Sequence, residues 1–239
     1  MLSKNKIKFI NTIKKKKARN EQGLFIVEGT KIVSELIRSP LDIELLCGKK
    51  QFINTLETKN KERIKDIVQI NDQDLKKISS LKTPNEVLAI ARQPNYSIDL
   101  DKIKNNLNLG LEAINDPGNL GTILRIADWF GINNIFCSND TVDVYNPKAV
   151  QATMGAISRV KIHYVDFNEF INDIKKLENF PIYGCFLQGN DIYDIPLSDK
   201  GIIILGSESH GISGGLSQFI ETRLFIPSFS QNTVFSSES

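Results

Sequence analysis

The stretch "NDPGNLGTILRIADWFGI" (residues 115–132) decides the fold of this chain. The apolar run before it, residues 107–114, predicts a buried strand. A polar turn with proline and glycine follows, and apolar residues then recur at helical spacing, which predicts a helix over residues 121–130. A strand that passes through a short turn into a helix is the repeating unit of α/β folds.

The same alternation continues toward the C-terminus. The apolar runs "NNIFCS", "KIHYVD", "PIYGCFL", "GIIILG" and "TRLFIPS" predict strands, and "PKAVQATMGAI" and "FNEFINDIKKL" predict helices. Nearly continuous apolar strands separated by helices are typical of a parallel sheet covered on both faces. Residues 107–239 are therefore predicted to form one parallel-sheet domain.

The first 95 residues predict a separate, small α/β domain. The expected helices cover residues 4–17, 30–39, with Thr30 as the N-cap, and 71–81, with one short helix between residues 47 and 66. The expected strands cover residues 24–29, 43–47, 66–70 and 87–92. The polar, proline-containing stretch "QPNYSIDLD" lacks periodicity, so we place a linker at residues 96–106.

The charge distribution indicates a polyanionic partner. The chain has 239 residues and a net charge of +2, but residues 1–20 carry +8 with no acidic residue, so the remainder carries −6. A basic leading segment on an acidic body is typical of nucleic-acid binding. The predicted RNA contacts are Lys14, Lys15, Lys16, Lys17 and Arg19, although a lysine-rich helix that only faces solvent would have the same composition.

Cysteine and histidine content excludes some classes of site. The three cysteines are far apart, and only two histidines are present, so no zinc site is expected. An odd number of cysteines fits a reducing compartment, and we expect a cytosolic protein. No apolar run is long enough to span a membrane, and the N-terminus has no apolar segment typical of a signal peptide.

Three glycine- or proline-containing loops follow predicted strands: "NDPGN", "GSESHGISGG" and "IPSFSQN". Ligands of parallel sheets gather at the carboxyl ends of strands, where backbone groups and helix N-termini are free to bind them. Any one of these loops alone could be an ordinary turn. Neither a phosphate-binding loop nor a dinucleotide-binding glycine fingerprint is present, which disfavours a Rossmann-type enzyme.

Taken together, the three loops resemble the motifs of the SpoU (TrmH-like) family of RNA ribose 2′-O-methyltransferases, in the SPOUT superfamily. "NDPGNLGTILRIADWFG" matches the pattern Asn-x-Gly-x-x-x-Arg, "IILGSESHGIS" matches a strand followed by Gly-x-Glu-x-x-Gly, and "NPKAVQATMGAISRV" resembles a small-residue helix between them. The N-terminal stretch is similar to the L30e-like substrate-binding domain of many members. The resemblance implies an α/β-knot methyltransferase domain that uses S-adenosylmethionine.

The resemblance also implies a catalytic group of Asn119, Arg125 and Glu208. A ribose 2′-hydroxyl must lose its proton as its oxygen attacks the methyl group. Arg125 could remove that proton in a desolvated site, or it could hold the neighbouring phosphate and place the oxygen in line. Glu208 would order the site by hydrogen bonding.

By the same resemblance, Gly206, Ile226, Leu187 and Ser239 contact the cofactor. Methyl transfer from a sulfonium needs no metal, because the donor loses its positive charge as the new bond forms. An apolar pocket with fixed backbone hydrogen bonds is sufficient, which agrees with the lack of metal ligands in the sequence.

The third family motif departs from this sequence. It should continue from Ile226-Pro227 to a Ser-Leu-Asn-Val-Ser segment, but the chain ends at "FSSES", with Ser239 on the motif serine. Reading "SQNTV" as a degenerate version places it too close to Pro227. Since that segment completes the trefoil knot, the pocket and much of the dimer face in family members, we expect a truncated C-terminus to weaken cofactor binding and dimerisation.

The expected function is S-adenosylmethionine-dependent 2′-O-methylation of RNA, of ribosomal RNA in preference to transfer RNA, by a homodimer. The alternatives are a transfer RNA methyltransferase and an RNA-binding protein that has kept the scaffold and lost turnover. The intact Asn119, Arg125 and Glu208 argue against long decay, and the incomplete third motif argues for it.

Overall fold

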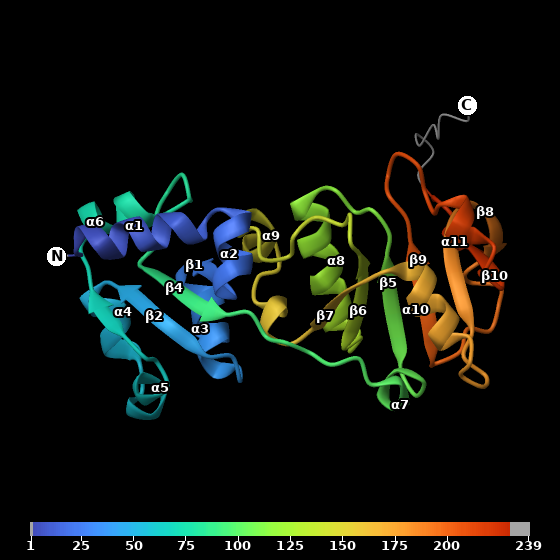
Figure 1. Cartoon of the computed structure of the whole chain (residues 1–239), viewed down its shortest axis with the longest axis horizontal. Helices are drawn as coiled ribbons and strands as arrows, with labels where there is room; N and C mark the ends of the chain where they lie inside the picture. Colours follow the sequence, from blue (N-terminus) through green and yellow to red (C-terminus); the bar gives the residue numbers. More distant parts are fainter. Residues whose placement is uncertain (1, 230–239) are drawn as a thin grey trace. The chain divides into compact units, whose positions relative to one another are not determined.

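The computed structural model describes residues 2–229, which form two compact units (Figure 1). The first unit contains the residues up to Ile98 together with Ile114–Ile135 and Asp140–His163. The second contains Asp99–Ala113, Phe136–Asn139 and the residues from Tyr164 onward. The first unit therefore combines the N-terminal α/β region with two helices of the region that carries the motifs.

The N-terminal region is built on a four-stranded sheet with strand order β1-β4-β2-β3. The strands are β1 (Leu24–Glu28), β2 (Ile43–Gly48), β3 (Ile67–Gln69) and β4 (Val87–Arg92). Strand β4 pairs antiparallel with β1 and β2, while β2 pairs parallel with β3. All four strands lie within the predicted ranges, to within a residue at their ends.

The helices of this region are α1 (Lys4–Ile13), α2 (Lys16–Gln22), α3 (Thr30–Arg38), α4 (Lys50–Thr55), α5 (Thr58–Glu62) and α6 (Asp72–Ile78). Helices α1 and α6 cover one face of the sheet, where Ile10 and Ile78 pack on Ile26 and Ile90. Successive strand residues point to opposite faces. Phe25 therefore faces the other side, where its ring lies 4.9 Å from that of Tyr145.

Two local predictions in this region are wrong. The helix expected over residues 4–17 ends at Ile13, and α2 begins at Lys16, because Lys15 is extended and the guanidinium of Arg19 binds the free carbonyls of Ile13 and Lys14. Gly29, with φ 97°, occupies the N-cap predicted for Thr30. Only glycine adopts that backbone conformation readily, and Thr30 is instead the first helical residue.

The first unit also contains α8 (Pro117–Trp129), α9 (Pro147–Ala152) and the 3-10 helix η1 (Ala156–Ser158). Helices α8 and α9 pack closely at Gly121, which has no side chain. A Cβ at this position would overlap Ala152 and lie 2.8 Å from the carbonyl oxygen of Ala149. The predicted helix over residues 147–157 instead ends at Ala152, and Met154 and Gly155 beyond it have positive φ angles of 51° and 102°. Small residues in both motif stretches thus serve helix packing.

The second sheet has the strand order β10-β8-β9-β5-β6-β7. Its strands are β5 (Leu107–Leu111), β6 (Asn134–Ser138), β7 (Lys161–Val165), β8 (Ile182–Asp191), β9 (Gly201–Leu205) and β10 (Thr222–Phe225). The β5–β9, β9–β8 and β8–β10 pairs are all parallel. The predicted parallel sheet is confirmed for these strands.

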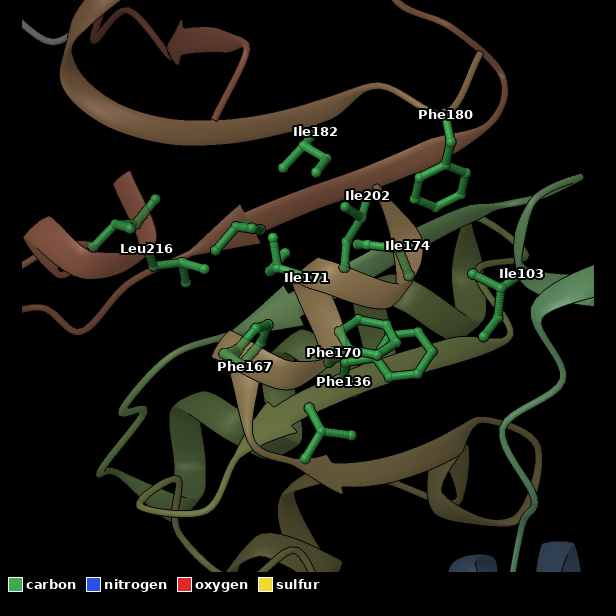
Figure 2. Packing of buried hydrophobic residues seen from close by; sticks show 13 residues of the cluster. Ile103, Phe136, Phe167, Phe170, Ile171, Ile174, Phe180, Ile182, Ile202 and Leu216 are labelled. Atoms are coloured by element: carbon green, nitrogen blue, oxygen red, sulfur yellow. The ribbon is translucent and has the colours of Figure 1, made fainter. Parts of the chain in front are cut away.

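The core of the second unit lies between its strands and helix α10 (Phe167–Ile174), as Figure 2 shows. Phe136 of β6 stacks on Phe170 with ring centroids 4.2 Å apart, and Ile171 and Ile174 continue the apolar face of α10. The short helices α7 (Leu100–Ile103) and α11 (Gly214–Ser217) contribute Ile103 and Leu216 to this core. Within residues 2–229, no helix is both long and apolar enough to cross a lipid bilayer.

Candidate active site

Helix α8 carries the first motif and begins earlier than predicted. The side chain of Asp116 accepts a hydrogen bond from the Asn119 backbone N–H at 2.8 Å, and Pro117 occupies the first helical position. Both features stabilise a helix start. Asn119 therefore lies in the first turn of α8 rather than in a loop, and Arg125 lies further along the same helix.

The exposed side of α8 presents Arg125 together with large apolar residues. Thr122, Arg125, Ile126 and Trp129 recur at helical spacing and are all exposed. Trp129 is 85% exposed and the adjacent Phe130 is 73% exposed. These residues border a groove of about 490 Å³, whose other wall includes Lys31 and Glu35 of α3.

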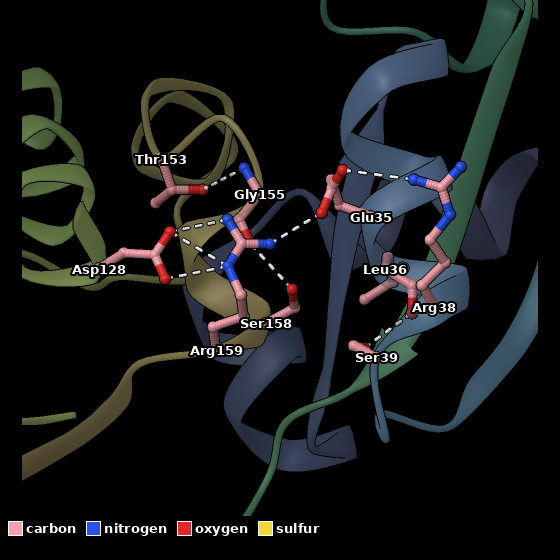
Figure 3. Close-up of polar contacts among 9 residues, drawn as sticks. All are labelled: Glu35, Leu36, Arg38, Ser39, Asp128, Thr153, Gly155, Ser158 and Arg159. Carbon is pink, nitrogen blue, oxygen red and sulfur yellow. Dashed lines mark hydrogen bonds and ion pairs between the residues drawn. The ribbon is translucent and has the colours of Figure 1, made fainter. Parts of the chain in front are cut away.

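Arg159 joins the two walls of this groove (Figure 3). Its Nε and Nη2 donate to the two carboxylate oxygens of Asp128 in α8 at 2.9 and 2.8 Å. Its Nη1 donates to Glu35 in α3 at 2.9 Å. The hydrogen bond with Asp128 is the main cause of the raised pKa of Arg159. Through these contacts the guanidinium links the N-terminal region to the helix that carries Arg125.

The second motif forms a closed loop after β9. Ser207 and Gly211 exchange two backbone hydrogen bonds, of 3.1 and 2.9 Å, and Glu208 is exposed on this loop. Gly206 approaches the backbone of Gly211 so closely that a Cβ at residue 206 would overlap it. Glycine at this position is therefore required by packing within the loop.

Glu112 is a candidate that the sequence reasoning missed. It follows β5, and its carboxylate accepts hydrogen bonds from the Ser213 backbone N–H at 2.8 Å and from the Ser213 hydroxyl at 2.6 Å. It thereby ties the carboxyl end of β5 to the segment just beyond the second motif. A polar residue directly after a buried strand was the signal that could have revealed it.

The predicted cofactor residues Leu187 and Ile226 are exposed apolar side chains, at 72% and 55%. The β8–β10 pairing shifts register after Gly184 and resumes at Asn190, so Leu187 lies between the two paired parts of β8. Tyr193 and Phe229 belong to the same unit, and their ring centroids lie 6.3 Å apart. Large apolar side chains of this unit are therefore exposed at several positions, and such side chains can contact a flat ligand.

The predicted RNA contacts differ in exposure. Lys15, Lys16 and Lys17 are exposed, whereas Lys14 donates to the Ser79 carbonyl at 3.1 Å and burial lowers its pKa, against the opposing charge of Glu28. Arg19 is only 2% exposed and pairs with Asp143. Its position gives Arg19 a structural role, which corrects its predicted role as an RNA contact.

Burial governs the protonation of the three cysteine thiols. Burial raises the pKa of the Cys47 and Cys137 thiols to about 12 and that of Cys185 to about 11, so these groups stay protonated. Residues 2–229 contain no group of three or more acidic, histidine or cysteine side chains suited to hold a metal ion.

The predicted site residues thus fall into two groups. Asn119 and Arg125 share α8 in the first unit, whereas Gly206, Glu208, Leu187 and Ile226 belong to the second. Ser239, like the alternative "SQNTV" segment, lies outside the described residues. The roles assigned to these residues stay predictions.

Comparison with known proteins settles the family. Residues 106–235, more than half of the chain, match the family model described as SpoU rRNA Methylase family. This chain belongs to the SpoU rRNA methylase family. Residues 4–89 also match the MRM3-like substrate binding domain. The resemblance inferred from the three loops is confirmed.

Relatives of this SpoU family member extend the match over nearly the whole chain. RlmP of Bacillus subtilis, a 23S rRNA (guanosine(2553)-2′-O)-methyltransferase, is 24% identical over 95% of this chain and 88% of its own length. A TrmH-family protein from Porphyromonas gingivalis is 34% identical with a TM-score of 0.87, covering 100% of this chain and 92% of the other. An AdoMet-bound rRNA methyltransferase from Sinorhizobium meliloti is 26% identical with a TM-score of 0.85, covering 98% and 90%. The predicted fold class is confirmed.

Proposed function

We propose that this chain is an S-adenosylmethionine-dependent ribose 2′-O-methyltransferase that acts on ribosomal RNA. The observation that carries the proposal is the close structural match to an AdoMet-bound rRNA methyltransferase over 98% of the chain. The family of the chain and the intact first and second motifs support the same reaction.

The second unit has features that fit the proposed cofactor. The exposed side chains of Leu187 and Ile226 offer apolar surface for an adenine face, and the tight loop at Gly206 presents backbone groups at the carboxyl end of β9. When bound, S-adenosylmethionine supplies an electrophilic methyl group. Glu112 and Glu208 would then keep the loops after β5 and β9 in place, Glu112 through its two hydrogen bonds to Ser213.

Arg125 could act as a proton acceptor or as a phosphate clamp, and its exposure favours the phosphate clamp. An exposed guanidinium is accessible to a phosphate, with which its planar fork forms paired hydrogen bonds. Arg125 is exposed on α8. We therefore propose that it binds the phosphate beside the target ribose and places the 2′-oxygen in line with the methyl group, while Asn119 orients the same nucleotide from the first turn of α8.

The N-terminal region would supply affinity for structured RNA. Lys15, Lys16 and Lys17 are exposed at the start of α2, and residues 4–89 match a substrate-binding domain. Phosphate contacts of this kind position RNA without reading its sequence. We further propose a homodimer, as the family resemblance implies, located in the cytosol.

Methyl transfer from labelled S-adenosylmethionine tests the proposed function. We expect the full chain to label ribosomal RNA in preference to transfer RNA, with the label in nucleotides whose 3′ linkage resists alkaline hydrolysis. Arg125→Ala should reduce kcat/KM at least a hundredfold, and Lys59→Ala, on exposed α5, should not change it. Preferential labelling of transfer RNA would overturn the substrate, and RNA binding without labelling of any RNA would favour the silent RNA-binding alternative.

A further inference from the structure

The groove beside Arg125 has an aromatic wall that the proposed reaction does not use. Trp129 and Phe130 end α8 with 85% and 73% of their surfaces exposed, and Ile126, also on this wall, is 50% exposed. Large exposed apolar surfaces commonly mark binding sites. At about 490 Å³, the groove has the volume of a small-ligand site.

The charges in the groove favour an anionic occupant. Its two acidic residues, Glu35 and Asp128, are both held by Arg159. Lys31 and Arg125 also line the groove, and among residues 2–229 neither forms an ion pair. Two cations beside an aromatic surface are the combination that binds single-stranded RNA, in which bases stack on rings and phosphates contact cations.

We propose that this groove binds a nucleotide of single-stranded RNA next to the methylated one, with its base on Trp129 and its phosphate between Lys31 and Arg125. The proposal rests on the proposed function for the identity of the RNA as substrate. Arg125 and Trp129 are four positions apart on one helix face, which places the phosphate site and the stacking surface side by side.

The same observations argue against a protein occupant. A second copy of the chain would cover Trp129 and Phe130 but would also have to bury Lys31 and Arg125 away from water, which is costly without acidic partners. The acidic residues of the groove are already engaged by Arg159. A phosphodiester supplies the missing negative charge, and a nucleobase supplies the flat apolar face.

The fluorescence of Trp129 tests the proposal directly, because the chain contains one tryptophan. We expect a short single-stranded RNA, such as a hexanucleotide of uridines, to quench this fluorescence saturably when titrated into the full chain without cofactor. Trp129→Ala should raise the Kd measured by anisotropy of labelled RNA about tenfold or more, and Trp129→Phe should restore most of the affinity.

Lysine variants supply the matched control. Lys31→Ala should weaken binding and reduce the magnitude of the slope of log K against log salt by about 0.7, the value for one phosphate contact of a single strand. Lys59→Ala, an exposed lysine on α5, should change neither. Binding that leaves tryptophan fluorescence unchanged, or an unchanged Kd for Trp129→Ala, would overturn the proposal.

Two further outcomes separate this proposal from others. If the fluorescence depends on protein concentration without RNA, and Trp129→Ala shifts sedimentation from dimer to monomer, the occupant is a second copy and the proposal fails. Since RNA binding is measured without methyl transfer, Trp129-dependent binding by a chain that labels no RNA would support the groove and contradict the enzymatic function. Methyl transfer with an unchanged KM for RNA in Trp129→Ala would support the enzymatic function and contradict the groove.

Discussion

Arg19 and Asp143 form an ion pair of 2.6 Å across 124 positions of sequence, with side-chain exposures of only 3% and 10%. Arg19 also donates to the Ile13 carbonyl at 3.3 Å, and Asp143 accepts from the Tyr145 backbone N–H at 2.9 Å. This buried pair joins the N-terminal helices to the segment that precedes α9.

Replacing Arg19 with alanine should therefore destabilise the first unit. Loss of one partner leaves a buried carboxylate without its counter-charge, which costs about 3–5 kcal/mol. Urea unfolding followed by far-ultraviolet circular dichroism measures the loss. Arg19→Met combined with Asp143→Asn, which removes both charges, should lose much less stability than the sum of the single variants. Additive losses would show that the pair contributes no coupling.

Arg159 should couple α3 to α8 through an exposed but well-aligned network. A double-mutant cycle between Arg159→Ala and Asp128→Asn should give a coupling energy of about 1 kcal/mol, at the upper end for exposed pairs because the contact is bidentate. Arg159→Lys should retain only part of it, since an ammonium lacks the planar fork. The matched control is a cycle between Lys104→Ala and Asp101→Asn, whose ion pair lies in the second unit. Equal coupling energies for the two pairs would count against the bidentate geometry.

Gly206→Ala should distort the second-motif loop, because the added Cβ would overlap the Gly211 backbone. Overpacking against backbone costs about 1–3 kcal/mol. Isothermal titration with S-adenosylmethionine should show at least tenfold weaker binding, with the sheet intact by circular dichroism. Gly214→Ala, where a Cβ would meet nothing within 4 Å, should bind like the unmodified chain. Unchanged affinity in Gly206→Ala would remove this loop from the cofactor site.

Acid should destabilise the protein through His163. Burial lowers the pKa of this imidazole below 6.5, the charge of Lys161 lowers it further, and a backbone hydrogen bond with Tyr96 partly opposes both. Since the unfolded chain binds the proton more readily, the stability from His163 is complete above about pH 6.5 and is lost as the pH falls toward the folded-state pKa.

The urea midpoint should consequently fall between pH 7.5 and 5.5, and His163→Gln should reduce that fall. The other histidine of the chain, His210, is exposed, with its Nδ1 2.8 Å from the Ser209 hydroxyl. His210→Gln serves as the control for replacing an imidazole at an exposed position. A fall of the same size in His163→Gln and in the unmodified chain would assign it to other groups.

The sequence predicted the strands well because buried strands appear as short apolar runs, such as residues 107–111 and 201–205. The ends of the helices were predicted less accurately. The earlier start of α8 was visible in the Asp-Pro pair at residues 116 and 117, but Arg19 gave no local signal, since its partner is 124 positions away. The role of Glu112 likewise depends on Ser213, which only the folded chain brings within hydrogen-bonding distance.

The first unit is built from segments on both sides of the predicted linker, which affects whether its N-terminal region could be separated from the rest of the chain. Residues up to Ile98 form one compact body with Ile114–Ile135 and Asp140–His163. Cutting the chain in the linker predicted at residues 96–106 would separate the partners of three contacts. These are the Arg19–Asp143 ion pair, the Phe25–Tyr145 ring contact and the bridge from Glu35 through Arg159 to Asp128. The N-terminal α/β region therefore depends on contacts with the segments of α8 and α9, and we expect that transferring it to another protein would require those helices as well.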